Sequence, residues 1–178
     1  MKSIIYSSDK VQSGLIANSA MDQQIKAPRF IYHVECRDKN GKIKWTEKIE
    51  NLVTTVGKTD IVDKYFKGST YTAGFFCGLK GTGTAVVGDT LASHAGWAEV
   101  TPYSGNRPAI TFGTTSAGSN TATAVAFTIN ATQTVAGAFI ATVNTGTSGT
   151  LYSAGDFGAS RSVISGDTLN VTLTVSVA

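Results

Sequence analysis

The residue types that most often perform chemistry are scarce in this sequence. It contains two histidines, His33 and His94, and histidine is the side chain that most often exchanges protons or binds metals near neutral pH. His94 lies just before Trp97, which makes it the best catalytic candidate in the chain. Neither histidine belongs to a metal-binding pair such as His-Glu-x-x-His. We therefore expect no metal site, and a structural role for His94 in ordering its turn.

Nucleophile and phosphate-binding motifs are incomplete. Residues 146–149, Gly-Thr-Ser-Gly, miss the spacing of the nucleophile elbow Gly-x-Ser-x-Gly. Residues 81–84, Gly-Thr-Gly-Thr, resemble a phosphate loop but lack the required Lys-Ser/Thr. The carboxylates that could form an acidic pair each have a plainer role in a turn or a cap; they are Asp89, Glu99, Asp156 and Asp167. The sequence predicts a protein that is not an enzyme and has no cofactor.

The distribution of charge argues against a nucleic-acid-binding surface. The chain has 178 residues, which fits one domain, and a formal net charge of +3. Residues 1–67 carry twenty of the twenty-seven charged side chains, and no lysine follows Lys80. A nucleic-acid surface needs clustered Lys and Arg. The second half is instead rich in Thr, Ser, Asn and Ala, so its faces can pack on neighbouring subunits without burying unpaired charge.

The cysteines and the N-terminus give no sign of export. Cys36 and Cys77 sit in apolar, strand-like surroundings, which favours two buried free thiols and leaves a disulfide as the alternative. After Lys2, the apolar run of residues 4–6 is far too short for a signal peptide. No stretch is long and apolar enough for a membrane span. We expect synthesis in a cytoplasm, without a signal sequence and without membrane contact.

The clearest structural pattern is the alternation over residues 167–177. Apolar side chains take every second position, at Leu169, Val171, Leu173, Val175 and Val177. A period of two gives two distinct faces only in a β-strand. The pattern predicts a strand with one buried face.

A hairpin is predicted over residues 30–49. Phe30, Tyr32, Val34 and Cys36 alternate with Ile31, His33, Glu35 and Arg37. Residues 38–41, Asp-Lys-Asn-Gly, have turn chemistry. A two-residue loop at Asn40-Gly41 would place Cys36 opposite Trp45 and keep the apolar residues on one face. A three-residue loop would oppose Trp45 to Glu35, so the pattern favours the even loop.

One helix is predicted over about residues 55–67. Apolar residues recur there at helical spacing, Thr54 or Thr55 can cap its start, and Gly68 suits its end. Gly57 is its weak point, because glycine is a poor helix former. The apolar stripe is interpreted as a lid on the β core rather than as a binding face.

The remaining pattern consists of short strands separated by loops. Strands are expected over residues 71–80, from about 97 to 101, and over 109–113, 123–129, 135–143 and 149–153. Asp89 is expected to cap a short helical turn that runs to His94. The fold class is therefore mainly β: an antiparallel β-sandwich or jelly-roll-like fold with one short helix and an extended N-terminal arm.

The chain divides at residue 29. Before it, apolar residues are sparse and aperiodic, which predicts either an arm that lies on a partner or a disordered leader. Residues 1–29 are thus the arm and residues 30–178 the body. The partner-binding candidates in the arm are Ile4, Ile5, Tyr6, Leu15 and Ile16.

Several short motifs in the body occur together in one order. They are residues 51–54 (NLVT), 89–97 (DTLASHAGW), 107–109 (RPA), 127–130 (FTIN), 137–139 (GAF), 149–152 (GTLY) and 165–171 (SGDTLNV). In this order they resemble small virion proteins encoded among the structural genes of tailed, particularly short-tailed, bacteriophages. The resemblance covers roughly residues 30–178 and leaves the arm outside it.

The resemblance implies a virion structural protein, most often a capsid cement or decoration subunit. Such a protein would be a homo-oligomer that bridges the major capsid protein or other virion proteins, with no direct contact to nucleic acid. A collar, head-to-tail or tail fibre attachment protein of the same virion is the first alternative. A carbohydrate- or receptor-binding β module is the second, and its loop-adjacent aromatic candidates are Tyr71, Tyr103 and Tyr152.

Overall fold

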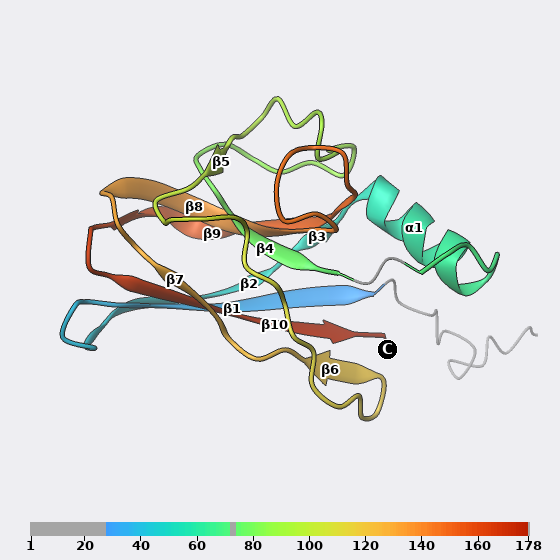
Figure 1. Cartoon of the computed structure of the whole chain (residues 1–178), viewed down its shortest axis with the longest axis horizontal. Helices are drawn as coiled ribbons and strands as arrows, with labels where there is room; N and C mark the ends of the chain where they lie inside the picture. The colour runs from blue at the N-terminus through green and yellow to red at the C-terminus, as the bar shows by residue number, and fades with distance from the viewer. Residues whose placement is uncertain (1–27, 72–73, 178) are drawn as a thin grey trace, which may run out of the picture.

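Two antiparallel sheets face each other in the computed structural model, which describes residues 28–71 and 74–177 (Figure 1). Each sheet has five strands. Sheet A runs in the order β2 (Ile43–Glu50), β1 (Arg29–Arg37), β10 (Thr168–Ser176) and β6 (Ser119–Thr121), and β7 (Val125–Thr128) also pairs with β10. Sheet B runs in the order β3 (Leu52–Val53), β9 (Leu151–Val163), β8 (Gln133–Ala141), β4 (Phe76–Lys80) and β5 (Glu99–Val100). The mainly β, antiparallel, sandwich-like fold is confirmed, and its jelly-roll form stays a prediction.

The main core lies between the two sheets. On β10, Leu169, Val171 and Leu173 are almost completely buried, as the alternation predicts. At the end of the alternating run, Val175 is half-buried, and Val177 lies beyond the strand with 53% of its surface exposed. The buried face of β10 therefore ends at Leu173, before the end of the strand.

Several predicted elements have different limits in the structure. The strand expected over residues 71–80 begins only at Phe76, and the one expected over 149–153 continues to Val163 as β9. Residues 109–113 form only isolated bridges to residues 76 and 122. The helical turn expected after Asp89 is wrong: residues 89–96 form turns and bends without a helix. The Asp89 carboxylate accepts from the backbone N–H of Val86 and from the indole N–H of Trp97, and not from residues that follow it directly.

The β1–β2 hairpin has the predicted register but not the predicted loop. Cys36 lies opposite Trp45, as expected. The backbone N–H of Asp38, however, donates to the carbonyl oxygen of Lys42 at 2.9 Å, which leaves a loop of three residues, 39–41, between them. Gly41 in this loop has a φ of 81°. That three-residue loop alone would shift the register, and a bulge between Arg37 and Cys36 shifts it back. The two-residue loop is therefore wrong, and a bulge keeps the apolar face intact.

The helix α1 (Thr55–Tyr65) is confirmed, with the Thr54 hydroxyl accepting from the backbone N–H of Gly57 at 3.1 Å. Its packing differs from the prediction. Gly57 is its one buried residue, and Ile61 packs on the core, whereas Tyr65 and Phe66 are 84% and 80% exposed. The helix sits at one end of the sandwich rather than over a sheet face, so most of its apolar stripe is not a lid (Figure 1).

The outer face of sheet B is covered by the loops that follow β4. Leu91 and Trp97 from these loops form a second core with Phe139, Leu151 and other residues of β8 and β9. Figure 1 shows these green and yellow-green loops on the side of sheet B away from sheet A. Among residues 28–71 and 74–177, no comparable set of loops covers the outer face of sheet A.

Candidate functional site

The two histidines lie on opposite sides of the sandwich. His94 stacks on Trp97, with ring centroids 4.0 Å apart, and its Nδ1 is 2.9 Å from the Trp97 carbonyl oxygen. These contacts support the predicted structural role in the turn. His33 is exposed on the outer face of sheet A. No proton relay or shared ligand can join two side chains that the body separates.

The four candidate carboxylates are bound by structural partners and are not brought together. Asp89 accepts from the indole Nε1 of Trp97 at 2.9 Å, and Asp156 pairs with the buried Lys80 ammonium at 2.7 Å. Glu99 pairs with Arg107 at 2.7 Å, and Asp167 pairs with Lys44 at 2.5 Å. Within the described ranges, no group of three His, Cys, Asp or Glu residues could hold a metal ion. The arrangement of these carboxylates stabilises loops and strand ends.

Both cysteines are free and buried, as the sequence favours. Burial raises the pKa of the Cys36 thiol to about 11, with a smaller contribution from the Asp167 carboxylate nearby. Burial alone raises the pKa of the Cys77 thiol to about 12. Because the thiolate is the reactive form, neither cysteine is suited to nucleophilic catalysis.

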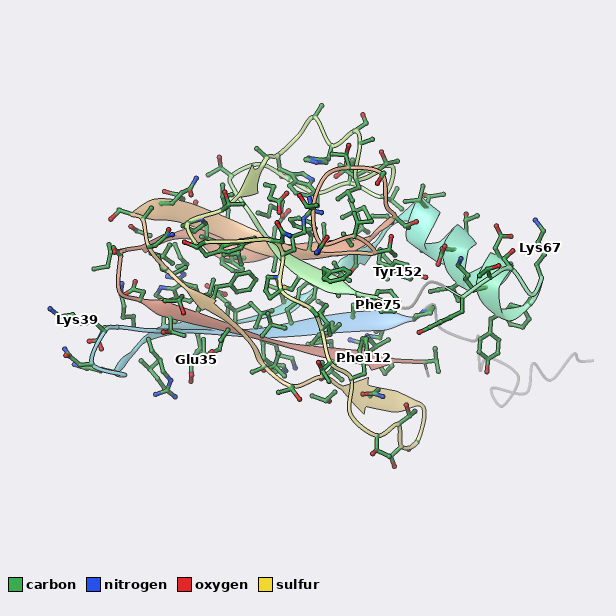
Figure 2. The ribbon with its side chains drawn as sticks, in the orientation of Figure 1. Glu35, Lys39, Lys67, Phe75, Phe112 and Tyr152 are labelled. Atoms are coloured by element: carbon green, nitrogen blue, oxygen red, sulfur yellow. The ribbon has the colours of Figure 1, made fainter. Side chains whose placement is uncertain are left out.

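The three tyrosines that are candidates for the carbohydrate- or receptor-binding alternative differ in exposure. Tyr71 is 71% exposed, but Tyr103 and Tyr152 are 8% and 5% exposed. Tyr103 packs edge-on against Phe127, and the Tyr152 hydroxyl donates to Asp60. Figure 2 shows Tyr152 in the interior near Phe75, whose ring centroid is 5.0 Å away. Two of the three aromatic rings therefore belong to the core.

The open outer face of sheet A is the main candidate binding surface. Neighbouring strands place His33 between Lys48 and Thr172, and Glu35 between Thr46 and Asn170. These side chains line a shallow groove of about 580 Å³, to which Ala124 adds a small side chain. We call this surface the sheet A face. Its donors and acceptors could bind a polar partner surface, and it offers no aromatic platform for a sugar ring.

Sequence reasoning missed the sheet A face because it followed the apolar side of each strand. The polar positions of residues 30–37 and 167–177 were visible as alternation, and they indicate an outward face for each strand alone. The register between β1 and β10, far apart in the sequence, is what joins them into one surface.

A second exposed surface surrounds the end of α1. Its members are large apolar side chains with at least half of their surface exposed: Val62 at 54%, Tyr65 at 84%, Phe66 at 80% and Tyr71 at 71%. We call this cluster the α1 patch. The sequence signal for it was the same helical stripe that was interpreted as a lid.

The arm candidates Ile4, Ile5, Tyr6, Leu15 and Ile16 lie outside the described residues. In the part of the chain that the structure describes, no helix is long and apolar enough to cross a membrane.

Comparison with known proteins adds no relative: no family model, no curated protein and no solved structure matches the chain. The fold and its surfaces define a mainly β, sandwich-like protein with one covered and one open sheet face.

Proposed function

We propose that this chain is a structural subunit of a bacteriophage particle, a capsid cement or decoration protein that binds across joints between shell subunits. The proposal joins the motif resemblance over residues 30–178 to the surface chemistry of the body. Its partner would be the major capsid protein, and other copies of the chain would bind beside it.

The observation that carries the proposal is the asymmetry of the two sheets. Sheet B is covered on its outer side by the chain's own loops, with Leu91 and Trp97 buried beneath them. In the described part of the chain, the outer face of sheet A is left open, with Thr, Asn, His, Glu and Lys side chains on it. A protein whose work is docking needs one face left free, and a polar face can be desolvated if its groups find hydrogen-bond partners.

The charges of the sheet A face are compatible with docking. Glu35 already pairs with Arg37 at 2.6 Å, so that part of the face carries a charge pair rather than a lone charge. A stable interface buries about 800 Å² on each partner, which a five-stranded sheet face can supply together with its rim. Binding to the assembled shell stabilises the shell by mass action, so internal DNA pressure must break these added contacts before the shell opens.

The experiment images purified particles that carry labelled protein. Dense, regular labelling over the head supports the decoration function, whereas a signal at one vertex replaces it with the collar or tail alternative. Absence of the label from particles that contain all other virion proteins would overturn both.

A pair of variants tests the face itself. Thr172→Arg places a long cation in the groove of the sheet A face, and Ala92→Arg places the same group on an exposed loop over sheet B. We expect co-sedimentation with shells to fall for Thr172→Arg and to be unchanged for Ala92→Arg. The reverse result would assign docking to the other side of the sandwich.

A further inference from the structure

The α1 patch is a concentration of exposed apolar surface that the proposed function does not use. Four of the ten large hydrophobic residues that are exposed in the described chain fall within residues 62–71. Val62, Tyr65 and Phe66 have the i, i+3, i+4 spacing that places side chains on one face of a helix. The rings of Tyr65 and Phe66 pack edge-on at 5.6 Å. Clusters of this kind on soluble proteins commonly mark a binding site.

The size of the patch favours a short segment over a folded partner. It covers little more than the last turn of α1 and the residues after it, where Ser69 N–H binds the Asp63 carbonyl at 3.0 Å. A stable dimer needs about 800 Å² on each copy. A peptide with two or three apolar side chains needs far less, because it can lie along a single helical turn.

The N-terminal segment enters the body close to this patch. The ring of Phe30, at the start of β1, is 6.5 Å from the ring of Tyr152, and the Tyr152 hydroxyl donates to Asp60 in α1. Phe66 lies about 9 Å farther along the helix axis than Asp60. The start of β1 is thus on the order of 20 Å from the patch, and Figure 1 shows both at the same end of the sandwich.

The composition of the arm matches the patch. Residues 11–21 contain no charged side chain, and Leu15 and Ile16 lie in their middle. Such a stretch can cover an apolar surface without desolvating a charge. Residues 17–28 would connect Ile16 to the body, and a flexible linker of that length has a root-mean-square span of about 20 Å. The span of the linker therefore matches the distance it has to cover.

We propose that Leu15 and Ile16 dock on the α1 patch of the same chain. The tether gives the segment an effective concentration of about a millimolar when the linker span matches the separation, which favours the chain's own arm over that of another copy. The inference goes beyond the proposed function, since it assigns an intrachain site to the near part of the arm. It makes no use of Ile4, Ile5 and Tyr6, the other partner-binding candidates of the arm.

The test is a spin label on the arm of the full-length protein. Cys36 and Cys77 are 0% and 1% exposed, so a thiol reagent at neutral pH labels only an introduced cysteine at Ser13→Cys. In a ¹⁵N-labelled sample, the amides of Val62, Tyr65 and Phe66 should lose most of their intensity to the spin label. Amides of the β1–β2 turn, at the far end of sheet A, should keep theirs (Figure 1).

Matched variants locate both halves of the contact. The lost intensity should return in either of two double variants, Leu15→Ser with Ile16→Ser in the arm or Tyr65→Ser with Phe66→Ser in the patch. Tyr65 and Phe66 are exposed, so replacing them should not disturb folding. Ile4→Ser with Ile5→Ser is the control and should change nothing. If the amides of α1 never broaden, or if neither pair restores them, the docking proposal is wrong.

A mixed sample separates the chain's own arm from that of a neighbour. Spin-labelled, unenriched protein is mixed with ¹⁵N-labelled full-length protein that carries Leu15→Ser and Ile16→Ser, so that its own arm does not occupy the patch. We expect no broadening of α1 in this mixture. Broadening there, at the same concentration as in the first sample, would overturn the intrachain proposal and assign the patch to the arm of a second copy. Particle labelling is a separate readout, so failure of the virion proposal leaves this result unaffected.

Discussion

At the scale of single residues, Gly57 has opposite meanings in the helix and in the fold. In an isolated helix it is a weak point, since alanine is favoured over glycine by about 1 kcal/mol. In the structure, a Cβ at this position would lie 2.5 Å from the carbonyl oxygen of Tyr152 and 3.0 Å from its Cα. The backbone of β9 cannot give way without disturbing sheet B, so glycine allows α1 to pack there.

Gly57→Ala should therefore destabilise the protein despite the better helix propensity. We expect a loss of about 1–3 kcal/mol in the free energy of unfolding, the usual cost of overpacking. Urea unfolding measures it, and Lys58→Ala, on the exposed side of the same turn, should stay within about 0.5 kcal/mol of the wild type. A stabilising effect of Gly57→Ala would mean that α1 does not rest on β9.

The histidines should not be catalytic. We expect His33→Ala and His94→Ala to leave particle assembly and infectivity within a small factor of normal. The His94 ring stacks on Trp97 and hydrogen-bonds its carbonyl oxygen, both within one turn, and His33 is exposed on the sheet A face. The measurement is a plaque assay with particle yield. Hydrolysis of a host glycan by purified protein, lost in a folded His94→Ala variant, would refute the prediction.

The buried thiols make stability depend on pH in the alkaline range. Folding raises the pKa of Cys36 to about 11 and that of Cys77 to about 12, from an ordinary value of 9.0. Below the ordinary value both states hold the proton, so pH has no effect through these groups. As the pH rises above it, the unfolded chain releases protons that the folded protein retains, and the free energy of unfolding falls.

We therefore expect urea midpoints, measured with reductant, to decline between about pH 8 and pH 10. In the double variant Cys36→Ala, Cys77→Ala, the urea midpoint should fall less between about pH 8 and pH 10 than it does in the wild type.

A second measurement tests the burial of the thiols directly. In the native protein at about pH 8, a chromogenic disulfide reagent should react with neither thiol until urea unfolds the chain. Rapid reaction without urea would show that the thiols are not buried.

At the scale of elements, β10 is the strand on which sheet A depends. It pairs with β1 over nine residue pairs from Arg29–Ser176 to Arg37–Thr168, and β6 and β7 pair with its other edge. Its inward side chain Leu173 is 2% exposed and lies opposite Tyr32, while the neighbouring Thr172 lies opposite His33 on the sheet A face. One residue step along β10 thus separates the core from the binding surface.

Leu173→Asp should bury an unpaired carboxylate and cost several kcal/mol, a large part of the roughly 5–15 kcal/mol that stabilise a domain. Thr172→Asp should be far milder, because its side chain points to the open groove. Thermal melting of the two variants compares them directly. Equal melting temperatures would mean that the two faces of β10 are assigned wrongly.

At the scale of the whole molecule, the body is organised around one covered and one open side. The loops after β4 close the outer side of sheet B, where the buried Lys80 ammonium also lies 5.6 Å from the centroid of the Trp97 ring. No described segment covers the outer side of sheet A in the same way. The start of β1 and α1 share one end of the sandwich (Figure 1).

Deleting residues 1–28 should leave the melting temperature of the isolated protein nearly unchanged but weaken its attachment to particles. In the described chain, the main core begins at Phe30, and the α1 patch lies on the surface, so the truncation removes no core contact. Calorimetry on the truncated protein and its co-sedimentation with shells that lack the native copy measure the two effects. Unfolding of the truncated body, or undiminished binding to shells, would contradict the prediction.

The sequence by itself determined the parts of this fold that depend on local periodicity. The alternation around Leu173 predicted the two faces of β10, and the Thr54 cap and helical spacing predicted α1. These patterns act over a few neighbouring residues, where the period of side chains is set by the backbone alone. The turn role expected of the candidate carboxylates fits Asp89 and Asp167, which accept from the backbone N–H groups of Val86 and Ile164, whereas Glu99 and Asp156 lie in β5 and β9.

Only the tertiary structure decided which of those faces is covered. The bulge that restores Cys36 opposite Trp45, the contact of Gly57 with Tyr152, and the exposure of the α1 patch all depend on segments distant in sequence. An apolar stripe has the same period whether a neighbour packs on it or solvent does, so periodicity cannot separate a lid from a docking surface. The loops after β4 cover sheet B and leave sheet A open because long-range packing, not local pattern, selects the face that is buried.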